Sequence, residues 1–130
     1  MGRTRLSETR GAAAVEFALV VPILIALIVA IAAFGRAYNI QSSMAMAARE
    51  GVRIAAIEHD ISAGKTVAGD VADDFGFPEA VVTSDNSDPC DGPDQRANIQ
   101  VKFEYDYFGL TGFFDSPIWI TGKAEMRCGG

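Results

Sequence analysis

The feature that most constrains the fold is an apolar run of 18 residues, Phe17 to Phe34, which contains no charged side chain. About 18 to 20 consecutive apolar residues is the length at which a helix can cross the hydrocarbon of a bilayer. Extended to Ala12 and Tyr38, such a helix would be roughly 40 Å long and would enter both membrane interfaces. The run therefore predicts a membrane-spanning helix.

The charges on either side of this run predict its orientation. The preceding segment, MGRTRLSETR, carries Arg3, Arg5 and Arg10 against the single acid Glu8. Because cytoplasmic flanks of membrane helices are rich in Lys and Arg, we expect the N-terminus in the cytoplasm and the remainder outside. From residue 59 onward there are 13 Asp and Glu against five Lys and Arg. This acidic balance makes nucleic acid an unfavourable partner.

One carboxylate interrupts the start of the apolar segment. Glu16 lies between Val15 and Phe17, and no cation is beside it in the sequence. A carboxylate in apolar surroundings loses hydration unless it has a partner. Two ordinary interpretations do not explain it. A secretory signal peptide, cleaved at the small residues around Ala30-Ile31-Ala32, normally has positive charge directly before its apolar core. A plain single-pass anchor gives Glu16 no role.

A third interpretation rests on resemblance. Gly11, the apolar stretch from Ala12 to Val15, Glu16, Phe17 and the hydrophobic helix that follows resemble the processing site of a type IV prepilin. In that family a membrane-embedded prepilin peptidase cuts after a glycine, and glutamate is the fifth residue of the mature chain. The resemblance implies cleavage between Gly11 and Ala12, which makes Glu16 the fifth mature residue.

Residues further along narrow the resemblance. Phe17, Gly35-Arg36 and the run from Ala47 to Arg53, AAREGVR, are similar to TadE-like pseudopilins, which are minor pilins of tight-adherence (Tad/Flp) type IV pilus systems. The similarity covers residues 10–56. It implies a non-enzymatic subunit that the prepilin peptidase processes and that takes part in assembling a pilus for adherence or secretion.

The same resemblance implies partners and a location. The expected partners are other pilin and pseudopilin subunits, contacted through the N-terminal helix, together with the prepilin peptidase and the inner-membrane assembly platform. The expected location is the bacterial inner membrane, with one span, and then the pilus at the cell surface. The competing function is a membrane-anchored or secreted extracytoplasmic binding domain that has no part in a filament.

The resemblance also implies a role for Glu16, which physical chemistry can check. Cleavage creates an α-amino group on Ala12, and such groups have a pKa of about 8 and are mostly charged at neutral pH. In a filament core, Glu16 of one subunit would pair with the Ala12 ammonium of a neighbour. Since an unpaired carboxylate there is costly, the pair would reject wrong axial registers. The alternative is that Glu16 only lies at the headgroup level of the membrane.

The expected fold is α+β: a long N-terminal membrane-spanning helix carrying a small antiparallel-sheet head, as in pilins. Residues 1–11 form a basic cytoplasmic leader, residues 12–58 the helix, with 12–36 in the membrane, and residues 59–130 an exported acidic head. The amphipathic part of the helix has a predicted packing stripe that begins at Tyr38 and Gln41 and continues through small residues. A second helix is predicted over 62–74, and strands are predicted over 80–84, 98–107 and 118–126. The last two strands alternate, so that one face is expected to be buried and the other wet. The residues of one side are Ile99, Val101, Phe103, Tyr105 and Tyr107, against Gln100, Lys102, Glu104 and Asp106, and in the last strand Ile118, Ile120, Gly122, Ala124 and Met126.

Two further features of the predicted head involve possible crosslinks. Cys90 and Cys128 would form a disulfide in an oxidising compartment, closing a loop of about 40 residues and stabilising the head by roughly 4 kcal/mol. Two reduced thiols remain the alternative. Between the strands, Asp85, Asp88, Asp91 and Asp94 supply oxygen ligands suited to calcium, but without the EF-hand spacing. A solvated acidic loop is the favoured interpretation, and no cofactor is expected.

The sequence offers little for catalysis. His59 is the only histidine, and no Ser-His-Asp arrangement or glycine-rich phosphate loop accompanies it. We therefore expect no enzymatic activity.

Overall fold

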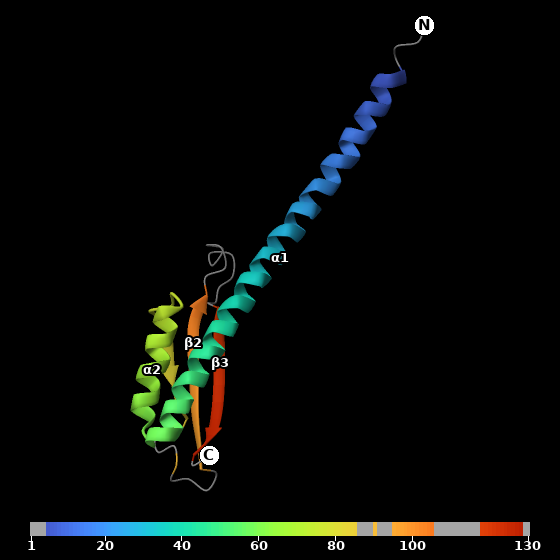
Figure 1. The fold of residues 1–130 in the computed structure, drawn as a ribbon. Helices are drawn as coiled ribbons and strands as arrows, with labels where there is room; N and C mark the ends of the chain where they lie inside the picture. The colour runs from blue at the N-terminus through green and yellow to red at the C-terminus, as the bar shows by residue number, and fades with distance from the viewer. Residues whose placement is uncertain (1–4, 86–89, 91–94, 106–117, 129–130) are drawn as a thin grey trace. The chain divides into compact units, whose positions relative to one another are not determined.

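The computed structural model describes residues 5–85, 90, 95–105 and 118–128, with side chains from residue 11 onward. Along the chain the elements are α1 (Arg5–Glu58), α2 (Ile61–Asp74), β1 (Val81–Thr83), β2 (Arg96–Tyr105) and β3 (Ile118–Arg127) (Figure 1). This confirms the predicted α+β fold with a long N-terminal helix. The chain divides into two compact units, Met1–Arg36 and Ala37–Gly130, called here the N-terminal unit and the head unit.

The first helix is longer at its start than predicted, because α1 begins at Arg5 within the basic leader rather than at Ala12. Its end agrees with the prediction to within a residue. His59 adopts a left-handed backbone conformation, with φ of 55°, which stops the helix. Asp60 then caps α2: its carboxylate accepts hydrogen bonds from the Ser62 backbone N–H at 2.8 Å and from the Ser62 hydroxyl at 2.7 Å.

The three strands form one antiparallel sheet in the order β1-β2-β3. In the middle of the sheet, Val81 and Thr121 lie on either side of Lys102 in register. Because side chains alternate along a strand, every second residue of β2 faces the helices. Ile99 and Val101 are fully buried on that face, which confirms the predicted alternation. Tyr107, predicted on the same face, lies outside the described residues.

Both helices of the head unit pack on this inner face of the sheet. The interface with α1 is formed by buried side chains that are mostly small. The predicted packing stripe was wrong at its start, since Tyr38 is 75% exposed and Gln41 is also exposed. The observed buried stripe instead follows the aliphatic side chains in the same turns of α1, because the sheet covers that side of the helix. Its buried residues are Ile40, Met44, Ala47, Ala48, Gly51, Val52, Ala55 and Ala56.

Glycines set the closeness of these contacts. A Cβ added at Gly122 of β3 would overlap the backbone of Met44 and Ala45, so this strand lies directly on α1. A Cβ at Gly64 of α2 would lie 2.6 Å from the Ala55 Cβ of α1. The head unit therefore has a core in which backbones touch, and only glycine or alanine fits at its closest points.

A disulfide closes the end of the sheet. Cys90 and Cys128 are bonded, with their Cα atoms 5.7 Å apart, as the sequence predicted. The Cys128 N–H also donates a hydrogen bond to the Gln95 carbonyl at 2.8 Å. The bridge thereby ties the segment before β2 to the end of β3.

Candidate processing and assembly segment

The predicted processing residues lie on α1 within the N-terminal unit. Gly11, Ala12, Glu16 and Phe17 are all helical and exposed. Ala12 and Glu16 are four residues apart, so they lie on the same side of the helix, about one turn apart. No described residue forms an ion pair or a hydrogen bond with Glu16. Within the described chain, the carboxylate thus has no partner.

Gly11 has no packing role in this fold. A Cβ added there would meet no atom within 4 Å. Glycine in a helix interior costs about 1 kcal/mol relative to alanine, so the residue weakens the helix without allowing any close contact. This contrasts with Gly51, Gly64 and Gly122, whose neighbours leave no space for a side chain. Contacts with the described residues therefore do not explain the glycine at position 11.

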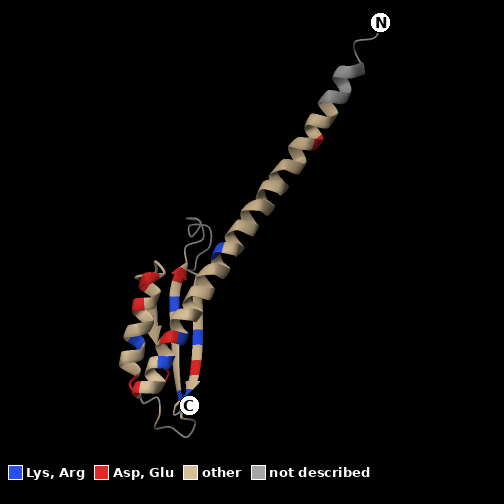
Figure 2. Cartoon of the chain, viewed as in Figure 1, with Lys and Arg blue, Asp and Glu red and all other residues tan. Residues whose placement is uncertain are grey.

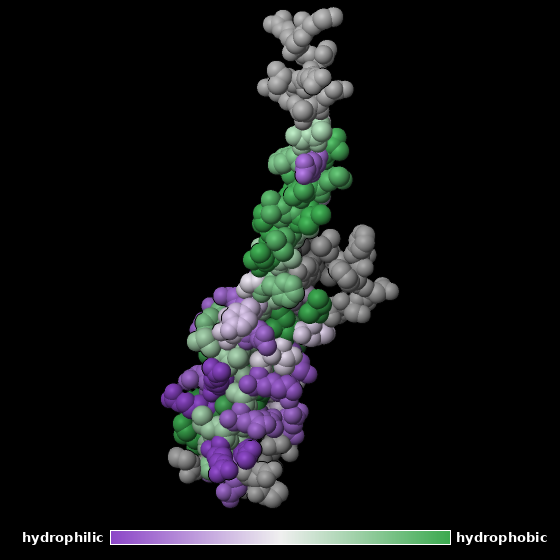
Figure 3. Space-filling model, turned by 90° about the vertical axis from the view of Figure 1, so that its right-hand side faces the viewer, coloured by the Kyte–Doolittle hydropathy of each residue, from purple (hydrophilic) through white to green (hydrophobic). Residues whose placement is uncertain are grey.

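The remainder of the N-terminal unit presents large apolar side chains outward. Phe17, Leu19 and Ile23 are 70 to 72% exposed, and the large aliphatic residues from Leu24 to Ile31 are 47 to 64% exposed. The side of this segment that faces the viewer in Figure 3 is hydrophobic almost throughout. Among the described residues one helix, Gly11–Glu58, is long and apolar enough to cross a membrane. The exposed apolar surface is compatible with a membrane anchor.

The AAREGVR run has a different environment, in the head unit. Ala47, Ala48, Gly51 and Val52 are buried against α2 and the sheet. The two arginines of this run are exposed, and Arg53 forms an ion pair with Glu50 at 3.6 Å. Most of this run therefore serves the packing of the head unit.

The possible calcium ligands are only partly described. Asp88, Asp91 and Asp94 lie outside the described residues. Asp85 is engaged in the sheet: its carboxylate accepts a hydrogen bond from the Gln100 side-chain amide at 2.7 Å, and its backbone N–H donates to the Asn98 side chain at 3.0 Å. Within the described ranges, no three His, Cys, Asp or Glu residues are grouped as a metal site would require.

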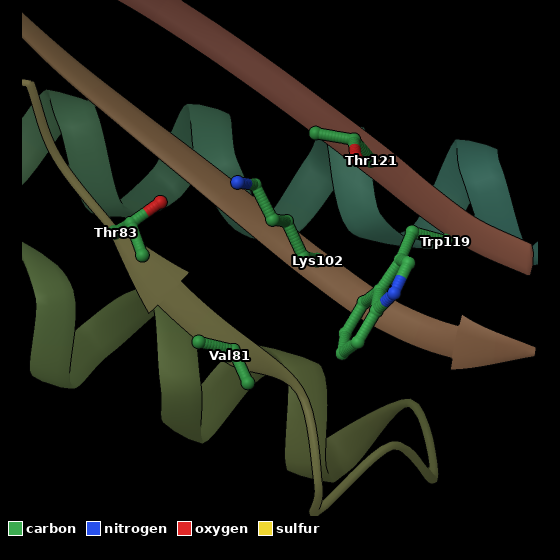
Figure 4. A pocket seen from close by; sticks show the side chains of 5 residues that line it. All are labelled: Val81, Thr83, Lys102, Trp119 and Thr121. Carbon is green, nitrogen blue, oxygen red and sulfur yellow. The ribbon is translucent and has the colours of Figure 1, made fainter. Parts of the chain in front are cut away.

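Sequence reasoning missed a groove of about 470 Å³ on the outer face of the sheet. Figure 4 shows its five lining side chains, which come from all three strands: Val81, Thr83, Lys102, Trp119 and Thr121. The strand alternation placed Lys102 opposite the buried side chains. However, the groove depends on which residues of the three strands are in register, and one strand's pattern does not contain that information.

Comparison with known proteins gives one match. Residues 11–53, about a third of the chain, match the family described as TadE-like protein, which confirms the resemblance predicted from the sequence. The match begins at Gly11 and ends within the buried part of α1. Searches of curated proteins and of solved structures gave no match.

Proposed function

We propose that this chain, which is TadE-like over residues 11–53, is a minor pilin of a tight-adherence pilus system, cleaved by a prepilin peptidase between Gly11 and Ala12. A TadE-like family match suggests a pilus-associated protein in general terms. The finer proposal is that residues 1–11 are a cytoplasmic leader, that 12–36 span the inner membrane, and that the head unit is exported.

The observation that carries this proposal is the contrast between Gly11 and its surroundings. Gly11 is a helix-weakening residue without a packing role, it is the first residue of the family match, and it precedes Glu16 by five positions. A peptidase with a narrow intramembrane site would select a residue without a side chain. This accounts for a glycine that the fold itself does not use.

Assembly would then use the new N-terminus. Cleavage leaves an ammonium group on Ala12, one helical turn from Glu16. Pairing within one chain is possible from this spacing, but it would not organise a filament. We propose that Glu16 pairs with the Ala12 ammonium of a neighbouring subunit, while exposed apolar residues such as Phe17 and Leu19 pack between subunits. Other pilin subunits and an inner-membrane assembly platform are the partners in this proposal.

The test is cleavage of the full chain in membranes that contain the prepilin peptidase, read by N-terminal sequencing and intact mass. The wild-type product should begin at Ala12, and Gly11→Leu should remain at full length. Gly35→Leu is the matched control, because position 35 is also a glycine of α1 with no atom within 4 Å of an added Cβ. That variant should be cleaved normally.

The competing function predicts other products. An uncleaved chain beginning at Met1 would indicate a plain membrane anchor, and a chain beginning at Ala33 would indicate a signal peptide. Either result for the wild-type chain would contradict the pilin proposal.

A further inference from the structure

The head unit separates its charges by face. From residue 59 onward the chain has only five Lys and Arg against 13 Asp and Glu. Four of the five cations are on β2 and β3, as the blue positions on these strands show (Figure 2). The strand register places their side chains on the outer face of the sheet. The alternation of the strands fixes this assignment, because Lys102 and Thr121 both line the outer groove. These four residues are Arg96, Lys102, Lys123 and Arg127.

The outer face also has an apolar centre. Trp119 is 50% exposed and Val81 is 48% exposed, and both border the groove beside Lys102 (Figure 4). An exposed tryptophan in a hollow that three strands form is typical of an interface core, because aromatic side chains are enriched there. Glu104 and Glu125 are acids of this face, and the Asp85 carboxylate accepts a hydrogen bond from Gln100 on the same face. Arg96 pairs with Glu125 at 3.8 Å. Among the described residues that line the groove itself, none is acidic.

The opposite side of the head unit has the complementary character. Helix α2 covers the inner face of the sheet with its small residues, including Ala68 and Ala72. Its solvent side carries the exposed acids Asp70, Asp73 and Asp74, which form no ion pair with any described residue. Phe75, which follows them, is 42% exposed. An acidic helix end with an aromatic side chain thus lies on one side, and a basic groove with an aromatic side chain lies on the other.

We propose that the groove of one copy of this chain binds the C-terminal end of α2 from a second copy. Lys102 and Lys123 would face Asp70, Asp73 and Asp74 of the neighbour, and Phe75 would contact the apolar groove beside Trp119. Charge complementarity favours this partner, because Lys102 is the one charged residue among the described residues that line the groove, and the charged residues in the last turn and a half of α2 are all acidic. The two surfaces are different and lie on opposite sides, so the contact is head-to-tail and can repeat from copy to copy.

This contact goes beyond the proposed pairing of Glu16 with Ala12, because it concerns the head units alone. It requires neither cleavage after Gly11 nor a pilus. Either proposal can therefore fail while the other holds.

The experiment uses the purified full chain in detergent micelles at low ionic strength. A carbodiimide joins a lysine amine to a carboxylate that touches it, and mixing isotope-labelled with unlabelled chains identifies links between copies by mass spectrometry. We expect links from Lys102 or Lys123 to Asp70, Asp73 or Asp74 of another copy. Their yield should fall steeply between 0.01 M and 1 M salt, where the Debye length shortens from about 30 Å to about 3 Å.

Charge reversal makes the test decisive. Lys102→Glu with Lys123→Glu gives a chain with two acidic surfaces, and Asp70→Lys with Asp73→Lys gives a chain with two basic surfaces. Each variant alone should lose its links between copies, by about tenfold or more, because like charges then face each other. An equal mixture of the two variants should restore the links, because each chain then complements the other. Restoration also shows that both variants are folded.

Two single reversals serve as controls. Lys65→Glu changes a cation of α2, which is not on the outer face, and Glu58→Lys changes an exposed acid at the end of α1. Both should retain the links between copies at close to the wild-type yield. The proposal is wrong if the wild-type chain gives no links between the two named surfaces, or if the mixture gives no more than either variant alone.

Discussion

Two regions of the helix α1 are both apolar, but they differ in the size of their side chains and in whether the rest of the chain covers them. In the N-terminal unit, α1 displays Phe17, Leu19 and Ile23 to the outside. In the head unit, the same helix buries Ala47, Ala48 and Ala55 against the chain's own sheet and second helix. Both regions are apolar. Large side chains remain exposed and available to lipid or neighbouring subunits, whereas small ones let backbones of the same chain approach closely.

The glycines repeat this contrast. Gly11 and Gly35 have open space around them, and Gly51, Gly64 and Gly122 have none. Packing therefore requires glycine at these three positions of the head unit, but not at Gly11 and Gly35 of the N-terminal unit. Substitutions at these positions test the distinction directly.

The largest effect is expected at Gly122. A valine there would collide with the backbone of Met44 and Ala45, which cannot move aside as a side chain could. Gly122→Val should lower the free energy of unfolding of the head unit by about 3 kcal/mol, the upper part of the usual range for overpacking. Urea unfolding of the full chain in detergent, followed by the fluorescence of Trp119, the only tryptophan, measures this. Gly35→Val is the control. If it lowered the free energy of unfolding by as much as Gly122→Val, the proposed difference between the two regions would be wrong.

Smaller changes in the free energy of unfolding, opposite in sign, are expected for substitutions at two glycines of α2. Gly64→Ala would bring a Cβ to 2.6 Å from Ala55 and should destabilise the head unit by about 1 to 2 kcal/mol. Gly69→Ala has its nearest neighbour at 4.0 Å, and it should stabilise the helix by up to about 1 kcal/mol, because alanine is the better helix former. The same urea titration compares the two variants. If both substitutions change the free energy of unfolding in the same direction, close packing of α1 and α2 does not determine the stability of the head unit.

The smallest effect is a pH dependence at the start of α2. Hydrogen bonds from the Ser62 hydroxyl and backbone N–H lower the pKa of Asp60 below its usual value. A lowered pKa in the folded state stabilises the fold above the usual Asp pKa of about 3.9, and this contribution is lost as the pH falls through the folded value. The effect is small because the carboxylate is exposed and screened by solvent.

Asp60→Asn isolates this contribution, because asparagine also caps helices but does not titrate. The wild-type chain should have the higher thermal midpoint at pH 7, and the difference should disappear in acid as the pH falls through the lowered pKa of Asp60. A difference that is constant with pH would mean that the charge of Asp60 is not involved.

The comparison of regions also explains what could be predicted from the sequence. The charge-free run after Glu16 and the alternation of Ile99 and Val101 were sufficient to predict the long helix and the central strand, because both patterns are local. The end of α1 was also predictable, since the helical pattern stops at His59. Recognition of Gly11 and Glu16 came from resemblance, and the family match supports that resemblance without testing their roles.

Features that depend on distant parts of the chain were missed or wrong. The packing stripe was predicted to start at Tyr38 and Gln41, because periodicity alone does not define which side of the helix the sheet covers. Gly122 looked like one residue of an alternating strand, although it is the closest contact between β3 and α1. The groove around Lys102 and Trp119 depends on the register of three strands.

The central claim, that the N-terminal unit assembles with other subunits through Glu16, is tested most directly by the amount of subunit in sheared pilus fractions. Glu16→Ala should be cleaved and inserted almost normally, because these steps need Gly11 and the apolar run. Its incorporation into pili should be lost, since an unpaired Ala12 ammonium in a dry filament core costs several kcal/mol, on the order of 3 to 5. Glu16→Asp, which is one methylene shorter, should be intermediate. Mature Glu16→Ala chains present in pili at the wild-type level would contradict the account.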